Sequence, residues 1–368
     1  MNKIGIIEYR KINRISPSQF YSMKNCAYKS LLAEAFKKKP LLPVSPNAYL
    51  GSVLHKMLEL IAKGMIKDEK GFNKAFDEQV KIQEESLVQQ GFEFFIPLQK
   101  NVKDFGMKKV LLKKHLRNTS EFQKKNRDIK FISEKWFESK DKMIGGKIDL
   151  IIEDETETEI IDFKTGAIKQ DILDEAGEIF SEIKPGYKEQ LMLYGYLYFE
   201  TTGKYPTRLS LVDLAKQKFT IDFTQAACNA IFREAKELLN VTNDCIETKS
   251  FVANPSELNC KYCLYRPACS FYLSLLENDH SFNDISGIIK NVAKYQNGNV
   301  SLFLENGTRK FTIANFLSDK YEEFNKSRDK YIVVFNLRKE ATDFAYSSTK
   351  TTMIYEENEG NKTPILSF

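Results

Sequence analysis

The segment covering residues 143–164 constrains the fold of this chain most strongly. Met143–Glu153 (MIGGKIDLIIE) and Thr158–Phe163 (TEIIDF) are rich in apolar and β-branched residues, which predicts two strands. The polar stretch Glu153–Glu159 between them predicts the tip of an antiparallel hairpin. Neighbouring strands lie less than about 5 Å apart, so such a hairpin brings side chains from both strands to one place.

Helical patterns precede this hairpin. Ser16-Pro17-Ser18-Gln19 is typical of a helix start, with Ser16 as the cap, Pro17 in the first turn and Gln19 closing a capping box. We expect this helix to run to about Phe36, with Cys26 in its middle, and a second helix near Asn47–Lys67. The pattern from Gly71 to Lys130 is also helical.

Residues 100–130 carry eleven Lys or Arg against three acidic residues. Such a charge run is either a solvated helix face or a positive wall along a nucleic-acid path. Phe131–Glu138 predicts a further strand, and Glu134 within it could support a site without matching any motif.

The later segments alternate between strand and helix patterns. We expect strands at Leu209–Leu214 and Lys218–Phe223, and helices at Tyr187–Glu200 and from Thr224 to about Asn240. After about residue 280 the chain predicts five short strands with Gly-Asn and Asn-Gly turns: Ile285–Lys294, Asn299–Glu305, Arg309–Ile313, Lys330–Leu337 and Thr351–Glu356.

Composition excludes some classes. Apolar residues at 42% and charged residues at 29% are typical of a globular protein, and the net charge of +5 permits an anionic partner without naming one. The sequence contains no apolar run long enough for a membrane span, no secretory signal and no nucleotide-binding GxxxxGK[ST] run. We therefore expect a cytoplasmic protein, and any ATP-driven motor beside it is a separate chain.

Asp149, Asp162 and Lys164 are the strongest candidates for chemistry. Asp149 lies within one predicted strand, and Asp162-Phe163-Lys164 closes the next, so Asp162 and Lys164 leave the same face of the sheet. Two close carboxylates favour a hard divalent cation, Mg²⁺ or Mn²⁺. The cation activates a water molecule for phosphodiester hydrolysis, and Lys164 orients or deprotonates that water. A surface ion pair would give the same spacing.

Three further residues have both structural and functional interpretations. His55 lies among apolar helical positions, so it is either a packed residue or a ligand. Gln190 and Tyr194 are four apart and share one helix face, either towards the core or towards a site.

These motifs, taken in order, resemble a known family. Gly51-Ser-Val-Leu-His55, Gly146-Lys-Ile-Asp149, Asp162-Phe-Lys164-Thr165-Gly166 and Gln190-x-x-x-Tyr194 are similar to the RecB-type nuclease motifs of the PD-(D/E)XK superfamily. The resemblance covers residues 16–275. It implies that His55, Asp149 and Asp162 bind metal, that Lys164 is catalytic, and that Gln190 and Tyr194 belong to the active site and contact DNA.

The cysteines form a second pattern. Cys260-x-x-Cys263-x₅-Cys269 provides three thiolates, and Cys26 is the natural fourth ligand. One cysteine before the His motif and three after the nuclease core resemble the iron–sulfur RecB-type subgroup, including AddB-type subunits and CRISPR-associated adaptation nucleases. That resemblance implies a structural [4Fe–4S] cluster that joins the N-terminal helix to the end of the nuclease domain, with Zn²⁺ or no metal as alternatives. Cys228 and Cys245 fit neither spacing.

We therefore expect an α/β protein with a restriction-endonuclease-like PD-(D/E)XK core, a helical N-terminal region and a small C-terminal β-barrel that is OB-like. The expected boundaries are a nuclease domain at 1–280 and an accessory domain at 281–368. Within the first lie a helical part at 16–130, a catalytic core at 131–225 and a cysteine knuckle at 255–275.

The predicted function is metal-dependent hydrolysis of DNA, preferably single strands or ends and by an exonuclease, in repair, recombination or defence, alongside a separate helicase. The alternatives are a duplex-specific endonuclease and an inactive nucleic-acid-binding scaffold.

In the C-terminal module, aromatic residues either form a barrel core or stack on bases beside Lys290, Arg309, Lys310 and Arg338. The aromatic residues concerned are Phe303, Phe311, Phe316, Tyr331, Phe335 and Phe344.

Overall fold

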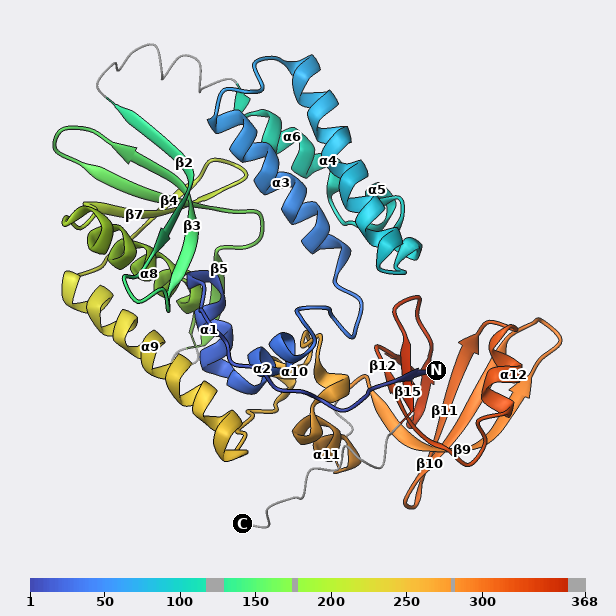
Figure 1. Ribbon diagram of the computed structural model, residues 1–368. Helices are drawn as coiled ribbons and strands as arrows, with labels where there is room; N and C mark the ends of the chain where they lie inside the picture. Colours follow the sequence, from blue (N-terminus) through green and yellow to red (C-terminus); the bar gives the residue numbers. More distant parts are fainter. Residues whose placement is uncertain (117–128, 174–177, 279–281, 357–368) are drawn as a thin grey trace. The chain divides into compact units, whose positions relative to one another are not determined.

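The computed structural model (Figure 1) describes residues 1–116, 129–173, 178–278 and 282–356. Contacts between Cα atoms divide the chain into two compact units. We call residues 12–24 and 45–244 the α/β unit, and residues 1–11, 25–44 and 245–368 the β-sheet unit. The predicted boundary at residue 280 stays a prediction. Among the described residues, no helix is both long enough and apolar enough to cross a lipid bilayer.

The α/β unit contains a five-stranded sheet in the order β2-β3-β4-β7-β8. Its strands are β2 (Lys130–Glu138), β3 (Gly145–Glu153), β4 (Thr158–Lys164), β7 (Arg208–Asp213) and β8 (Lys218–Ile221). The β3–β4 pair is antiparallel, which confirms the predicted hairpin, and β7 joins β4 in parallel. A mixed sheet results, with β4 at its centre.

Helices complete this unit. They are α1 (Pro17–Asn25), α3 (Pro46–Ala62), α4 (Glu69–Gln89), η1 (Glu93–Phe95), α5 (Leu98–Asn101), α6 (Phe105–Lys113), α8 (Pro185–Thr202) and α9 (Gln225–Thr248). Helix α8 packs against β2, β3, β4 and β7, and α9 packs on α8 through stacked Tyr196 and Phe232. The helical N-terminal region is thus confirmed, although residues 117–128 of the basic stretch lie outside the described residues.

A two-stranded hairpin, β5 (Lys169–Leu173) and β6 (Ile179–Ile183), lies in the sequence between strand β4 and helix α8. Sequence patterning does not predict it, because charged and apolar residues mix on both of its faces. Leu173 and Ile179 are 68% and 72% exposed, so this hairpin has no buried face of its own.

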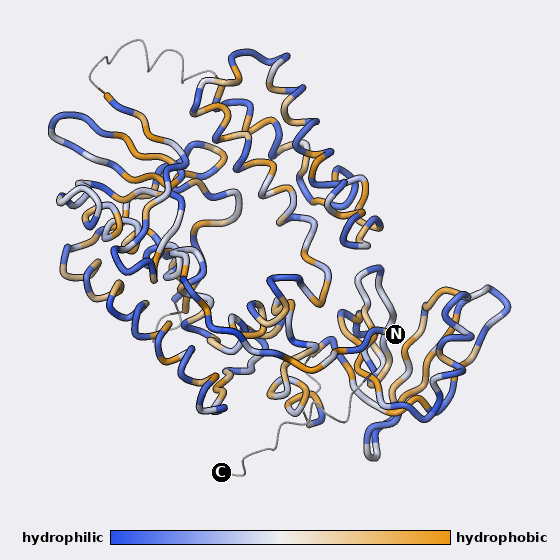
Figure 2. The backbone as a smooth tube through the Cα atoms, viewed as in Figure 1, coloured by the Kyte–Doolittle hydropathy of each residue, from blue (hydrophilic) through white to orange (hydrophobic). Residues whose placement is uncertain are grey.

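The β-sheet unit contains an eight-stranded sheet in the order β1-β15-β12-β9-β10-β11-β14-β13. Its strands are β1 (Asn2–Lys3), β9 (Ile285–Lys294), β10 (Val300–Asn306), β11 (Arg309–Phe316), β12 (Tyr331–Phe335), β13 (Arg338–Lys339), β14 (Ala345–Ser347) and β15 (Met353–Glu356). Apolar residues follow these strands while turns are polar (Figure 2). All five predicted strands are confirmed, and the two short strands β13 and β14 were not predicted.

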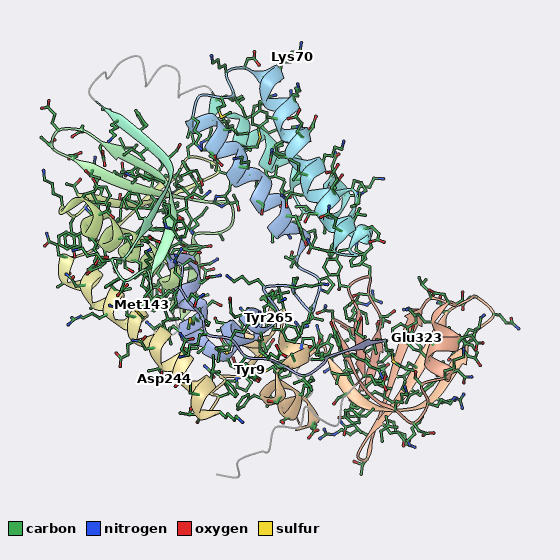
Figure 3. The ribbon with its side chains drawn as sticks, in the orientation of Figure 1. Tyr9, Lys70, Met143, Asp244, Tyr265 and Glu323 are labelled. Atoms are coloured by element: carbon green, nitrogen blue, oxygen red, sulfur yellow. The ribbon has the colours of Figure 1, made fainter. Side chains whose placement is uncertain are left out.

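Four helices also belong to this unit: α2 (Ala27–Ala35), α10 (Glu257–Cys260), α11 (Ser270–Asn278) and α12 (Lys320–Asn325). A short turn, η2 (Arg266–Ala268), lies in the cysteine knuckle. Figure 3 labels Tyr9 and Tyr265, which belong to this unit, and the Tyr9 hydroxyl lies 2.5 Å from that of Tyr28 on α2.

The predicted single helix up to Phe36 is wrong at one position. Its start at Pro17 is confirmed, but the helix breaks at Cys26, whose backbone is extended with φ −158° and ψ 95°. The Asn25 carbonyl accepts hydrogen bonds from the side chains of Asn254 and Asn259 instead of continuing the helix. Cys26 therefore lies at a helix junction, where tertiary contacts override local helical propensity.

Candidate active site

Asp149 and Asp162 face each other across the β3–β4 hairpin. The antiparallel pairs run from Glu153↔Thr158 to Leu150↔Ile161, so Asp149 and Asp162 are the next residues of the two strands beyond the last pair. Residues directly opposite in an antiparallel pair share one face of the sheet. Lys164 is two residues beyond Asp162 and shares that face. The structure thus brings the three predicted residues together.

Asp162, Lys164 and Gln190 form a closed triangle of contacts. The Gln190 side-chain amide donates to Asp162 Oδ1 at 2.8 Å, and Lys164 Nζ donates to Gln190 Oε1 at 2.8 Å. Lys164 Nζ also lies 2.6 Å from Asp162 Oδ2, an ion pair without hydrogen-bond geometry. Both Asp162 and Gln190 are buried, so Gln190 fixes the relative positions of the acid and the amine.

Asp149 has fewer contacts that could stabilise its negative charge than Asp162 has. Its Oδ2 accepts the Phe163 backbone N–H at 2.8 Å, and His55 Nδ1 lies 3.9 Å away. Burial, followed by the negative charge of Asp162, raises the pKa of Asp149 to about 8. Without a cation, this carboxyl group therefore carries a proton at neutral pH.

His55 and Tyr194 border the same carboxylates. Burial lowers the pKa of His55, against the charge of Asp162, so its imidazole is neutral and available as a ligand at pH 7. Burial raises the pKa of Tyr194, and its hydroxyl donates to the Lys147 carbonyl on β3 at 2.9 Å. We call His55, Asp149, Asp162, Lys164, Gln190 and Tyr194 the acidic centre.

Gly146 allows this centre to pack closely. A Cβ atom at Gly146 would lie 2.8 Å from Pro17 Cδ and 3.1 Å from Tyr194 Cε1. Real Cβ contacts of 2.8 Å essentially never occur, so β3 approaches α1 and α8 closely only because residue 146 has no side chain. The strand that carries Asp149 is positioned by this approach.

Glu134 is the residue of this site that sequence reasoning left aside. The β2–β3 register passes from Ser133↔Leu150 to Lys135↔Ile148, so Glu134 stands across from Asp149. Its carboxylate pairs with Lys147 and is almost fully buried. The register of the predicted strands is the signal that could have placed it opposite Asp149.

The acidic centre fits a divalent cation by its chemistry. In the described ranges, Asp162 Oδ2 is buried and has no hydrogen-bond partner, and Asp149 forms no ion pair with a lysine or arginine. Buried charges in proteins are paired or coordinate metals. However, within the part of the chain that the structure describes, no three His, Cys, Asp or Glu side chains are already arranged around a metal position. Side chains would have to rotate inwards on binding.

The four predicted cysteine ligands lie around one small cavity in the β-sheet unit. Cys260, Cys263 and Cys269 are buried, Cys26 is half-buried, and all six cysteines of the chain are free thiols. Burial raises the pKa of Cys260, Cys263 and Cys269, so without a metal these thiols stay protonated. Cys228 and Cys245 do not line this cavity.

The cavity has a volume of about 20 Å³, room for roughly one water-sized group. Four thiols are a donor set for either a zinc ion or an iron–sulfur cluster. Lys29 and Arg266 also line the cavity and supply positive charge against bound thiolates.

The α/β unit has a larger hollow, of about 420 Å³, on α8 and α9. Tyr196, Phe232, Arg233 and Lys236 line part of it, and no residue of the acidic centre does. Volume alone therefore does not mark the active site of this protein.

The chain was compared with protein families, curated proteins and solved structures. Residues 14–270 match the family model of the PD-(D/E)XK nuclease superfamily. A solved structure from Eubacterium rectale, whose protein is provisionally named an exonuclease, is 10% identical, with a TM-score of 0.43. The match covers 68% of this chain and 87% of the chain in that solved structure. No curated protein matches the sequence. With most of its length matched by the family model, the chain belongs to the PD-(D/E)XK nuclease superfamily.

Proposed function

We propose that this protein is a Mg²⁺- or Mn²⁺-dependent deoxyribonuclease whose active site is the acidic centre. The observation that carries the proposal is the Asp149–Asp162 pair facing across β3 and β4, with Lys164 on the same face. His55, Asp149 and Asp162 would hold the cation. Bound there, the cation would activate a water molecule and stabilise charge on the phosphate.

The protein's own residues prepare this chemistry. Lys164 is positioned by Gln190 and Asp162, so its ammonium group stays in place to orient a water molecule or to stabilise a phosphate oxygen. Lys164 Nζ also lies 4.3 Å from the Tyr187 ring centroid, which limits its rotation further. Tyr194 supports the strand that carries Asp149 through the Lys147 carbonyl.

Substitution of the acidic centre tests the activity. Asp162→Asn and Lys164→Ala are expected to lower the rate of DNA degradation at least about 100-fold with Mg²⁺ or Mn²⁺. The exposed Asp222→Asn and Lys204→Ala serve as matched controls with unchanged rates. Circular dichroism checks that each variant is folded. Full activity of Asp162→Asn or Lys164→Ala would remove the nuclease assignment in favour of an inactive binding scaffold.

We further propose that the substrate is single-stranded DNA or DNA ends, attacked as an exonuclease in repair, recombination or defence. A linear single strand, a circular single strand and a blunt duplex, each labelled, separate the alternatives. Degradation of the linear strand alone supports the proposal. Cutting of the circle indicates an endonuclease, and cutting of the duplex alone indicates a restriction-type enzyme.

For the cysteine cavity we propose a structural [4Fe–4S] cluster, with Zn²⁺ as the alternative. The proposal is supported by four free thiols around one cavity and by the order of cysteines and nuclease motifs. Iron, sulfide and zinc are measured per chain in anaerobically purified protein. A brown sample with about four irons per chain supports the cluster; stoichiometric zinc without iron replaces it.

For the C-terminal sheet we propose an OB-like module that contacts single-stranded DNA, beside a separate helicase or other partner. The topology supports an OB-like barrel: β9–β10–β11 form an antiparallel meander, β12 pairs with β9, and β14 pairs in parallel with β11. Phe311, Phe316 and Phe335 are buried in the core, whereas Phe344 is 43% exposed and available to stack on a base.

A further inference from the structure

Glu134 occupies an unusual position on strand β2, the edge strand beside Asp149. Its backbone φ is +56°, in the left-handed region that a non-glycine residue rarely adopts within a strand. Such a conformation is strained and persists only where surrounding contacts hold it. The contacts of the Glu134 side chain are therefore informative.

Those contacts direct the carboxylate towards the acidic centre rather than towards solvent. The Glu134 side chain is only 13% exposed, and its Oε2 lies 2.5 Å from Lys147 Nζ on the neighbouring strand. Its negative charge also contributes to raising the pKa of Asp149 and of Tyr194. Three carboxylates, from β2, β3 and β4, thus adjoin one another.

Within the described residues, the two lysines of this region pair with only two of its three carboxylates. Lys164 pairs with Asp162, and Lys147 pairs with Glu134, while Asp149 accepts only a backbone N–H and lies beside a histidine. Separately, the buried Oδ2 of Asp162 lacks a hydrogen-bond partner. With all three carboxylates ionised, the centre would hold three negative charges against two lysines, so it has a place for a further cation.

The side chain of Lys147 is held in place less firmly than that of Lys164. Its side chain is 53% exposed, against 14% for Lys164, and among the described residues it has no second side-chain partner comparable with Gln190. A divalent cation can therefore displace the Lys147 ammonium group towards solvent at little cost.

We propose that Glu134 is a third carboxylate of the cation site, neutralised by Lys147 in the metal-free protein and released to the cation or its water ligands on binding. This inference rests on the proposed metal-dependent function. It assigns Lys147 the role of a resident counter-charge that competes with the cation.

Direct Mn²⁺ binding to the full chain, without DNA, tests this proposal. Free Mn²⁺ is followed by electron paramagnetic resonance during titration of the wild type and of Glu134→Gln, Lys147→Ala and Asp162→Asn. Glu134→Gln is expected to weaken binding about 10-fold. Lys147→Ala is expected to tighten it about 3-fold or more, because a competing positive charge is gone. Glu138→Gln, on the same strand, is the matched control with unchanged affinity.

The outcomes distinguish a failure of the whole metal site from a failure of the role of Glu134 alone. If Asp162→Asn binds Mn²⁺ like the wild type, the proposed metal site fails altogether. If Asp162→Asn loses binding while Glu134→Gln keeps the wild-type affinity, only the role of Glu134 is overturned. Lys147→Ala decides the matter independently should Glu134→Gln not fold: unchanged or weaker affinity in that variant contradicts the counter-charge role.

Discussion

Gln190 shows how one neutral side chain can organise two charged ones. Its amide donates to Asp162 and its carbonyl oxygen accepts from Lys164, so both charged groups are fixed by a single rigid residue. In Gln190→Leu both hydrogen bonds are lost while the volume is nearly kept. We expect a fall in kcat of about 10- to 100-fold with a smaller change in KM. Steady-state cleavage assays check this; a change confined to KM would contradict it.

His115 makes the stability of the α/β unit dependent on pH. Burial lowers the pKa of His115 to about 4, although its Nε2 lies 3.2 Å from the Leu214 carbonyl oxygen. The unfolded chain binds a proton near pH 6.5 and the folded chain does not until about pH 4. Stability is therefore lost as pH falls through this window, by about 1–2 kcal/mol for a half-buried ring.

Replacement of His115 isolates this contribution. We expect His115→Gln to lose less unfolding free energy than the wild type between about pH 7 and pH 4.5, by about 1–2 kcal/mol. Urea unfolding of both proteins at the two pH values measures the difference. Parallel losses in the two proteins would place the pH dependence elsewhere.

At the scale of elements, strand β3 depends on the absence of a side chain at Gly146. In Gly146→Ala the new Cβ meets Pro17 and Tyr194, so β3 must move away from α1 and α8. We expect a loss of about 1–3 kcal/mol in unfolding free energy, together with lower activity because Asp149 moves with its strand. Gly106→Ala, where a Cβ meets nothing within 4 Å, serves as the control and is expected to be neutral or slightly stabilising.

The elements differ in how far sequence alone determines them. Strands β3 and β4 were predictable because their apolar alternation and polar tip act locally. Helix α9 runs to Thr248, beyond the predicted end near Asn240, because its polar last turns continue a strongly amphipathic helix that packs on α8. The break at Cys26 was not predictable, since the flanking residues favour helix and the break depends on distant asparagines.

The residues of the candidate site also differ in how far the sequence alone predicts them. Sequence motifs alone group together the residues of the acidic centre: His55, Asp149, Asp162, Lys164, Gln190 and Tyr194. Glu134 matches no motif: its contribution comes from a left-handed backbone and a cross-strand register, both of which exist only in the folded sheet.

At the scale of the whole molecule, a buried ion pair connects the cysteine knuckle to the C-terminal sheet within one unit. Asp284 is 3% exposed and accepts from Arg266 Nε at 2.5 Å, the Tyr272 hydroxyl at 2.6 Å and the Asn336 backbone N–H at 2.8 Å. Arg266 also lines the cysteine cavity and donates to the Cys263 carbonyl. The knuckle and the sheet therefore share one polar core.

Removal of one partner is expected to loosen this unit strongly. Asp284→Asn leaves the buried Arg266 charge without its counter-ion, which costs about 3–5 kcal/mol. Chemical unfolding and limited proteolysis of residues 281–356 measure the effect. Glu340→Gln, which breaks an exposed pair with Arg338, is the control and is expected to leave the stability unchanged. Equal stabilities of the two variants would show that the buried pair contributes nothing.

The division of the chain into interleaved segments also has a consequence for biosynthesis. Residues 1–11 and 25–44 leave the ribosome well before the remainder of their unit, which begins only at residue 245. The α/β unit, complete by residue 244, can assemble while synthesis continues. The early segments, Cys26 among them, must wait for the last third of the polypeptide, so any chaperone or metal-loading factor that protects this thiol has to act during translation.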